Sequence, residues 1–212
     1  MANHITEGSP IASVFTSAGA PAPAAAVEVV QEAVTVAVEI GFERTAEQDA
    51  ALGLRQLTDI AVKAISPAVN DPITAAHAIG YCGDLIGRLQ GRKLGAQQHL
   101  DPEGVPRVVT PDRDHRYYLD LVCAPLRRFG RSEPLVLTAL LRMLRACAVT
   151  ARDQAQRAEI ARQTGLILDT MDPDLIAPDA QEVRDFAGRV EQALTGNLDG
   201  AFRDRAGETR SV

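Results

Sequence analysis

The most distinctive polar residues of the chain gather in one short stretch, ISPAVNDPITAAH, at residues 65–77. Asn70 or Asp71 can cap a helix by accepting hydrogen bonds from its first N–H groups. Pro72 fits the first helical position, where its missing N–H costs nothing. A helix N-terminus can also bind an anion. The stretch therefore has two interpretations, a helix stop and restart or a polar ligand pocket built on that corner.

The ligand interpretation draws on both flanking segments. Thr74 and His77 are three residues apart, so they share one face of a helix. Arg55 could form a bidentate pair with a carboxylate or phosphate. The candidate ligand-binding residues are Arg55, Gln56, Asp59, Ser66, Asn70, Asp71, Thr74 and His77. An enzyme acting on a small anionic substrate would need Asp59, Asp71 or His77 to converge on one cavity.

Other chemistry has less support at this corner. Asp59, Asp71 and His77 are metal-ligand types, but they follow no fixed ligand spacing, so neither a metal nor a cofactor is predicted. Ser66 lies before a proline and outside any nucleophile-elbow pattern. No catalytic residue can be assigned, and a non-enzymatic role is favoured.

The three cysteines, Cys82, Cys123 and Cys147, are far apart, and each lies in an apolar helical pattern. An odd count without short spacings favours neither a disulfide framework nor a zinc site. We expect three buried free thiols, which indicates a reducing compartment.

The charge balance limits the partners. The chain has 22 basic and 28 acidic residues and a net charge of −6. It has no basic patch interleaved with aromatic residues, so no nucleic-acid partner is expected. No stretch approaches the ~18 apolar residues that span a bilayer, and the first residues do not resemble a signal peptide. We therefore expect a cytoplasmic chain without direct membrane insertion.

The elements that must position these residues are mostly helices. With few aromatic residues, the core must rest on Ala, Leu, Val and Ile, which suits closely packed helices. The expected fold is mainly α, a compact multi-helix domain with a small β element near the N-terminus and another at about 105–111. The predicted parts are an N-terminal β arm at 1–16, a linker at 17–26, a helical domain at 27–195 and a flexible tail at 196–212.

Capping and stop signals give the helix boundaries. Thr45 and Gln48 form a capping box that predicts the start of the second helix. The predicted helices lie at about 23–40, from Thr45 to the corner, 72–90, 113–129, 133–163 and 180–195. Asp179 is the candidate cap of the last one, and the stretch just before residue 105 is predicted as a loop.

The helix after the corner contains three glycines, Gly80, Gly83 and Gly87. Glycine is costly inside a helix, so close approach of another helix is expected to compensate. This face also makes a homo-oligomer plausible.

One segment resembles a known family. Residues 41–75, with ERTAEQD, GLRQLTDIAVKAISP and NDPITA, resemble the soluble C-terminal part of the domain-of-unknown-function family 2254, predicted bacterial membrane proteins. RVVTP, RRFG, EPLV and the N-terminal ITEGSPIASV resemble the same family, so the likeness spans most of residues 5–195. Such family members carry transmembrane helices before this region, which this sequence lacks. The resemblance implies no biochemical activity.

Together these observations predict a non-enzymatic soluble module of a membrane-protein family, acting by protein association or small-ligand sensing. The alternative is an enzyme that uses the 55–77 corner. The expected partners are a second copy of the chain and a membrane protein, which would hold the cytoplasmic chain at a membrane.

Overall fold

The computed structural model describes residues 9–38, 41 and 49–203. The chain divides into two compact units, Met1–Asp49 and Ala50–Val212. This division falls after the first helix, which the sequence analysis had grouped with the later helices. The predicted capping box of Thr45 and Gln48 lies outside the described residues.

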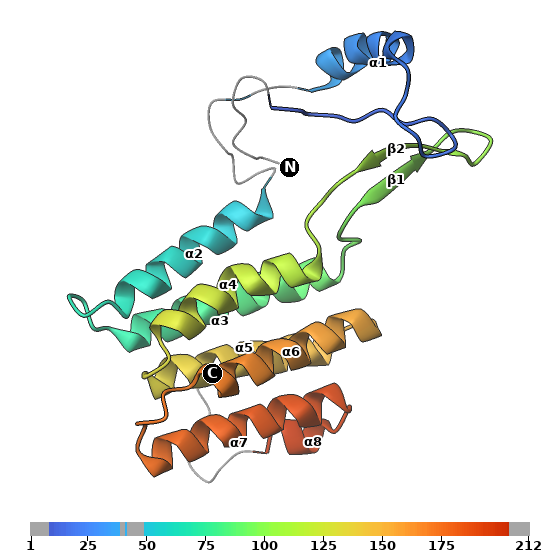
Figure 1. Ribbon diagram of the computed structural model, residues 1–212. Helices are drawn as coiled ribbons and strands as arrows, with labels where there is room; N and C mark the ends of the chain where they lie inside the picture. The colour runs from blue at the N-terminus through green and yellow to red at the C-terminus, as the bar shows by residue number, and fades with distance from the viewer. Residues whose placement is uncertain (1–8, 39–40, 42–48, 204–212) are drawn as a thin grey trace. The chain divides into compact units, whose positions relative to one another are not determined.

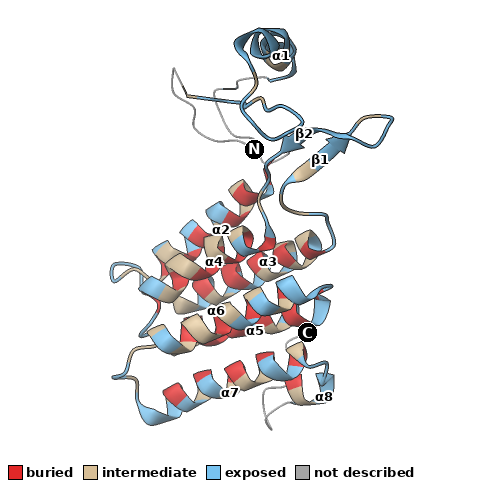
Figure 2. Ribbon diagram, turned by 45° about the vertical axis from the view of Figure 1, so that its right-hand side comes forward, coloured by how far each residue is buried: buried red, intermediate tan, exposed pale blue. Residues whose placement is uncertain are grey.

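Among its described residues, the first unit contains one helix, α1 (Ala24–Ala37), which confirms the helix expected at about 23–40. Pro23 precedes it in an extended conformation. None of its residues is buried, and the helix is pale blue in Figure 2.

The β element expected near the N-terminus is wrong for the described residues 9–16, which contain no strand. Phe15 instead forms an isolated bridge with Pro21, inside the predicted linker. A tight turn between Thr16 and Ala20 joins them, with Gly19 at a φ of 79°. Prolines cannot donate to a strand ladder, so this proline-rich stretch closes a turn and does not extend into a sheet.

The second unit is mainly helical, as expected. Its helices are α2 (Ala50–Ala64), α3 (Pro72–Gln90), α4 (His115–Phe129), α5 (Pro134–Thr150), α6 (Gln154–Thr170), α7 (Ala177–Leu194) and α8 (Leu198–Ala201). Helix α5 packs between α3 and α7, while α4 packs between α2 and α6 (Figure 1). Contacts of α3 with α4 and of α5 with α6 join these two rows.

The core is centred on α5, which is buried almost continuously from Val136 to Ala148. Figure 2 shows the buried positions where the helices of this unit face one another. All three cysteines are buried free thiols, which confirms that prediction. Burial raises the pKa of Cys82 and of Cys147 to about 12, so these thiols stay protonated and unreactive near neutral pH.

A hairpin connects α3 to α4. Its strands are β1 (Gln97–Leu100) and β2 (Pro106–Thr110), paired antiparallel. Strand β2 matches the strand expected at about 105–111, but β1 lies in the predicted loop, so that prediction is wrong. The turn depends on Asp101, whose carboxylate accepts hydrogen bonds from the backbone N–H groups of Glu103 and Val105. Such an Asx turn can join two strands with little apolar alternation.

The single helix predicted at 133–163 is wrong, because the chain breaks there into α5 and α6. Asp153 caps α6 by accepting a hydrogen bond of 2.8 Å from the backbone N–H of Gln156. The side-chain oxygen of Gln156 accepts a bond from the backbone N–H of Arg152 in return. This reciprocal arrangement resembles a capping box and explains why a new helix starts here.

The last predicted helix starts earlier than expected. Helix α7 begins at Ala177 after Ile176, and Asp179 lies in its first turn, so Asp179 is not its cap. Beyond α7, in the predicted tail, Asn197 caps the short helix α8. Ala201 of α8 is buried, which ties this part of the chain to the core.

Candidate functional site: the 65–77 corner and the groove beside it

The corner is built largely from its own backbone. The backbone N–H of Asp71 donates to the carbonyl of Ala64, and the Ser66 hydroxyl donates to the carbonyl of Lys63. Asn70 has a φ of 49°, a left-handed conformation that asparagine tolerates better than most residues. These contacts reverse the chain between α2 and α3.

Asp71 is the cap that the sequence left open between two residues. One carboxylate oxygen accepts from the Thr74 backbone N–H at 3.0 Å, and the other accepts from the Thr74 hydroxyl at 2.5 Å. The hydroxyl bond, then the backbone bond, hold the pKa of Asp71 below its ordinary value, and the charge of His77 adds a smaller share. The stop-and-restart interpretation thus accounts for Asp71 and Thr74 without a ligand.

The remaining candidates are spread over α2. Arg55, Gln56 and Asp59 are all exposed on that helix. Within the described residues, no hydrogen bond or ion pair joins Asp59 to Asp71 or His77. The structure therefore brings together Asp71, Thr74 and His77, and the ligand-binding role of the eight candidates stays a prediction.

His77 lines a groove that runs between α3 and α5. The cavity has a volume of about 410 Å³. Its lining residues are Ile73, Ala76, His77, Gly80, Gly83 and Asp84 from α3 and Leu135, Ala139, Arg142, Met143 and Ala146 from α5. We call this cavity the α3/α5 groove. Most of its walls are small or apolar, and His77, Asp84 and Arg142 supply its charged or titratable groups.

Two glycines of α3 differ within this groove. A Cβ atom on Gly83 would lie 3.1 Å from the side-chain Cγ of Met143, so close approach of α5 explains this glycine. A Cβ atom on Gly80 would meet nothing within 4 Å. Close packing, which the sequence analysis expected for both, is found at Gly83 and not at Gly80.

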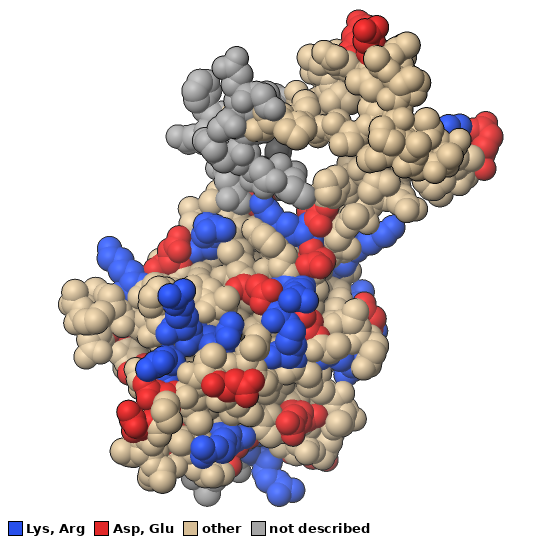
Figure 3. Space-filling model, viewed as in Figure 1, with Lys and Arg blue, Asp and Glu red and all other residues tan. Residues whose placement is uncertain are grey.

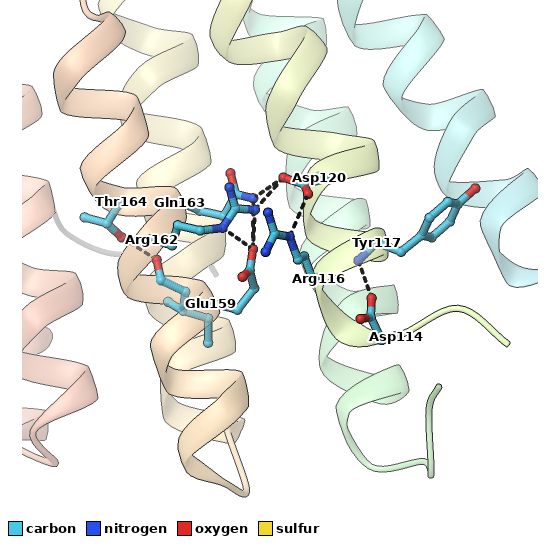
Figure 4. Close-up of polar contacts among 9 residues, drawn as sticks. Asp114, Arg116, Tyr117, Asp120, Glu159, Arg162, Gln163 and Thr164 are labelled. Carbon is cyan, nitrogen blue, oxygen red and sulfur yellow. Dashed lines mark hydrogen bonds and ion pairs between the residues drawn. The ribbon is translucent and has the colours of Figure 1, made fainter. Parts of the chain in front are cut away.

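Between α4 and α6, charged side chains bridge the helices, and we call this the α4/α6 seam (Figure 4). Arg162 donates to Asp120 at 2.6 Å and to Glu159 at 2.7 Å. The amide of Gln163 donates to Asp120 at 2.7 Å, and Arg116 forms a longer ion pair with Asp120 at 3.6 Å. Sequence reasoning missed this cluster, because its members lie more than forty residues apart in the chain.

The charges of the seam shift its pKa values. Burial alone would raise the pKa of Asp120, but hydrogen bonds from Arg162 and Gln163 outweigh it and hold the pKa below its ordinary value. Hydrogen bonding to Glu159 and Asp120 raises the pKa of Arg162, against the effect of burial. Both shifts favour the charged forms of Asp120 and Arg162, so these two residues form an ion pair and not an acid–base pair.

His115 lies at the start of α4 and is 8% exposed. Burial lowers its pKa below 6.5, and the carboxylates of Glu159, Asp153 and Asp114 offset part of this effect. Within the described residues neither ring nitrogen makes a hydrogen bond. From the sequence we expected His115 to be a solvated loop residue, and this prediction is wrong, because His115 is the first residue of α4 and is buried.

On the face shown in Figure 3, acidic and basic side chains are interspersed over the helices of the second unit.

No metal-binding group of three or more His, Cys, Asp or Glu side chains occurs among the described residues. In the same part of the chain, no helix has the length and apolar character that a membrane crossing requires.

Fold and site thus define a mainly helical protein with an open groove and no assigned chemistry. Residues 2–146 match the family described as predicted membrane protein (DUF2254), and the chain belongs to this family. That assignment confirms the resemblance on which the sequence analysis relied.

The relatives found are uncharacterized proteins of Mycobacterium bovis and of two strains of Mycobacterium tuberculosis. Each is 41% identical over 131 residues, which make up 62% of this chain and 25% of the relative. The match therefore spans a quarter of the length of these relatives. No solved structure matches the chain significantly.

Proposed function

We propose that the chain acts by protein association and that the α3/α5 groove is its docking surface. The observation that carries this proposal is the cavity of about 410 Å³ between α3 and α5, which is lined mostly by small or apolar residues and includes the exposed helical glycine Gly80. A helical glycine costs about 0.5–1 kcal/mol relative to alanine. A protein segment that packs closely against α3 would explain why this position holds glycine.

The walls of the groove support this proposal. Ala76, Ala139 and Ala146 are small, so a helix or loop can approach the backbone of both α3 and α5. Ile73, at the start of the groove, is 60% exposed and would be covered by a partner. Because the family is described as predicted membrane proteins, a membrane protein is one class of partner.

Enzymatic use of the corner is the weaker hypothesis. Both oxygens of Asp71 already accept hydrogen bonds from Thr74, and Asp59 is exposed on another helix. A general base would need a free carboxylate within reach of a bound substrate.

A bulky side chain in the groove tests the proposal. Gly80→Leu should fill the groove while leaving the fold intact, since its Cβ meets no neighbour. Gly165→Leu is the matched control, a second helical glycine with open space, on α6. In extracts of cells that make the full chain, size-exclusion chromatography should show the wild type and the control in a complex and Gly80→Leu free. Identical elution of all three would overturn the proposal.

A further inference from the structure

We infer that the partner in the α3/α5 groove is a second copy of this chain, whose α3 lies antiparallel to the first and crosses it at Gly80. This inference rests on the proposed function and names its partner. The argument comes from the residues that α3 presents to solvent around this glycine.

Two exposed polar residues of α3, a histidine and a carboxylate, lie on either side of the crossing point, and the exposed Arg88 lies one turn further toward the end of the helix. His77 lies three residues before Gly80 and Asp84 lies four residues after it, and both are exposed. They fall on one face of the helix because they are seven residues apart. In an antiparallel pair, His77 of each copy would therefore face Asp84 of the other. The same complementary contact is made twice, as a two-fold interface requires.

The groove leaves room for this approach. The open space at Gly80 lets two backbones come close, as glycine does wherever helices cross tightly. The neighbouring α5 wall includes two small residues, Ala139 and Ala146, together with the exposed Arg142. A helix that lay on Gly83 would instead meet Met143, which already fills that position.

Apolar side chains flank the same face. Ile73 is 60% exposed and Tyr81 is 63% exposed, although both lie on a helix with a well-buried opposite side. Their burial between two copies would add an apolar contribution to the charge pairs. A two-fold interface uses the same patch on both copies, so association would stop at the dimer and would not continue into filaments.

Charge reversal of the pair tests the inference in the purified full-length chain by sedimentation equilibrium. The wild type should be a dimer that dissociates on dilution. His77→Glu should place a like charge opposite Asp84 of the other copy, and Asp84→Lys should remove the carboxylate that His77 of the other copy meets. Each should weaken dimerisation by about tenfold or more, because the changed contact occurs twice per dimer. The double variant, His77→Glu with Asp84→Lys, should restore the dimer.

A matched control uses two exposed charges with the same spacing on α7, Arg184→Glu and Glu191→Lys. Neither should change the dimer, alone or together. A wild type that stays monomeric at all concentrations, or a double variant that fails to recover, overturns the second copy as partner. If the complex in cell extracts is nevertheless lost with Gly80→Leu, the proposed docking surface stands and its occupant is another protein.

Discussion

The α3/α5 groove and the α4/α6 seam both lie between neighbouring helices of the same unit, but paired side chains fill the seam whereas the groove is open. In the seam, Arg162 of α6 pairs with Asp120 of α4 and with Glu159 of its own helix, so these charged groups are satisfied within one chain. In the groove, small residues leave a cavity of about 410 Å³. The side chains of the seam therefore pair within the chain, whereas the groove leaves space that a second molecule can occupy.

The largest expected effect separates the two sides of α3. Ile79 is fully buried, whereas Ile73 is 60% exposed in the groove. Ile79→Ala should lower the free energy of unfolding by about 2–5 kcal/mol, because it leaves a cavity in the core. Ile73→Ala should change it by less than about 0.5 kcal/mol and instead weaken association. Urea unfolding of both variants measures this difference, and equal losses would mean that Ile73 is part of the core.

The seam should contribute the next largest effect. Arg162→Ala would leave Asp120 and Glu159 without their shared partner, and the Arg162 side chain is only 31% exposed. The free energy of unfolding should fall by about 1–3 kcal/mol, discounted for the partial exposure of Asp120. Arg184→Ala on α7, where the side chain is exposed, is the control and should have little effect. A loss no larger than the control's would show that the seam is not held by its ion pairs.

A smaller effect distinguishes the two glycines of the groove. Gly80→Ala should raise the free energy of unfolding by about 0.5–1 kcal/mol, because alanine favours the helix and its Cβ meets no neighbour. Gly83→Ala should gain less or lose stability, since its Cβ would lie 3.1 Å from Met143. Thermal melting of the two variants at low protein concentration provides the comparison. The reverse order would contradict the description of the groove.

The smallest expected effect is a pH dependence at the edge of the seam. In the folded protein, burial lowers the pKa of His115 below 6.5, so the unfolded chain binds this proton more readily. The contribution of neutral His115 to the free energy of unfolding is therefore complete above pH 6.5. It is lost as the pH falls through 6.5 toward the lower pKa of the folded state. Melting temperatures between about pH 8 and pH 5 should show a smaller acid loss in His115→Gln than in the wild type. The same slope in both proteins would assign the loss to other groups.

Local signals in the sequence predict much of the second unit. Pro72 after Asp71 marks the start of α3, and Gly130 marks the end of α4. The reciprocal pair of Asp153 and Gln156 was present in the sequence too, but no proline or glycine marks the break between α5 and α6. Boundaries set by short capping interactions can thus be predicted when the cap is recognised.

The site was less predictable, because it depends on contacts between distant segments. The spacing of Thr74 and His77 placed them on one face of α3. It did not show that Thr74 donates hydrogen bonds to Asp71 whereas His77 lines the groove. The other wall of that groove comes from α5, about sixty residues further along the chain. Gly80 and Gly83 look alike in sequence, and only the position of Met143 distinguishes them.

The central claim, that the groove is a docking surface, is tested most directly by the accessibility of a thiol placed inside it. Ala146 lines the groove and Ala158 lies on α6, and both are exposed alanines in helices. The native cysteines are buried, so a maleimide should label only the introduced thiol of Ala146→Cys or Ala158→Cys. We predict that Ala146→Cys is labelled several-fold more slowly than Ala158→Cys in the cells that make the chain. Equal labelling of the two positions there would contradict the claim.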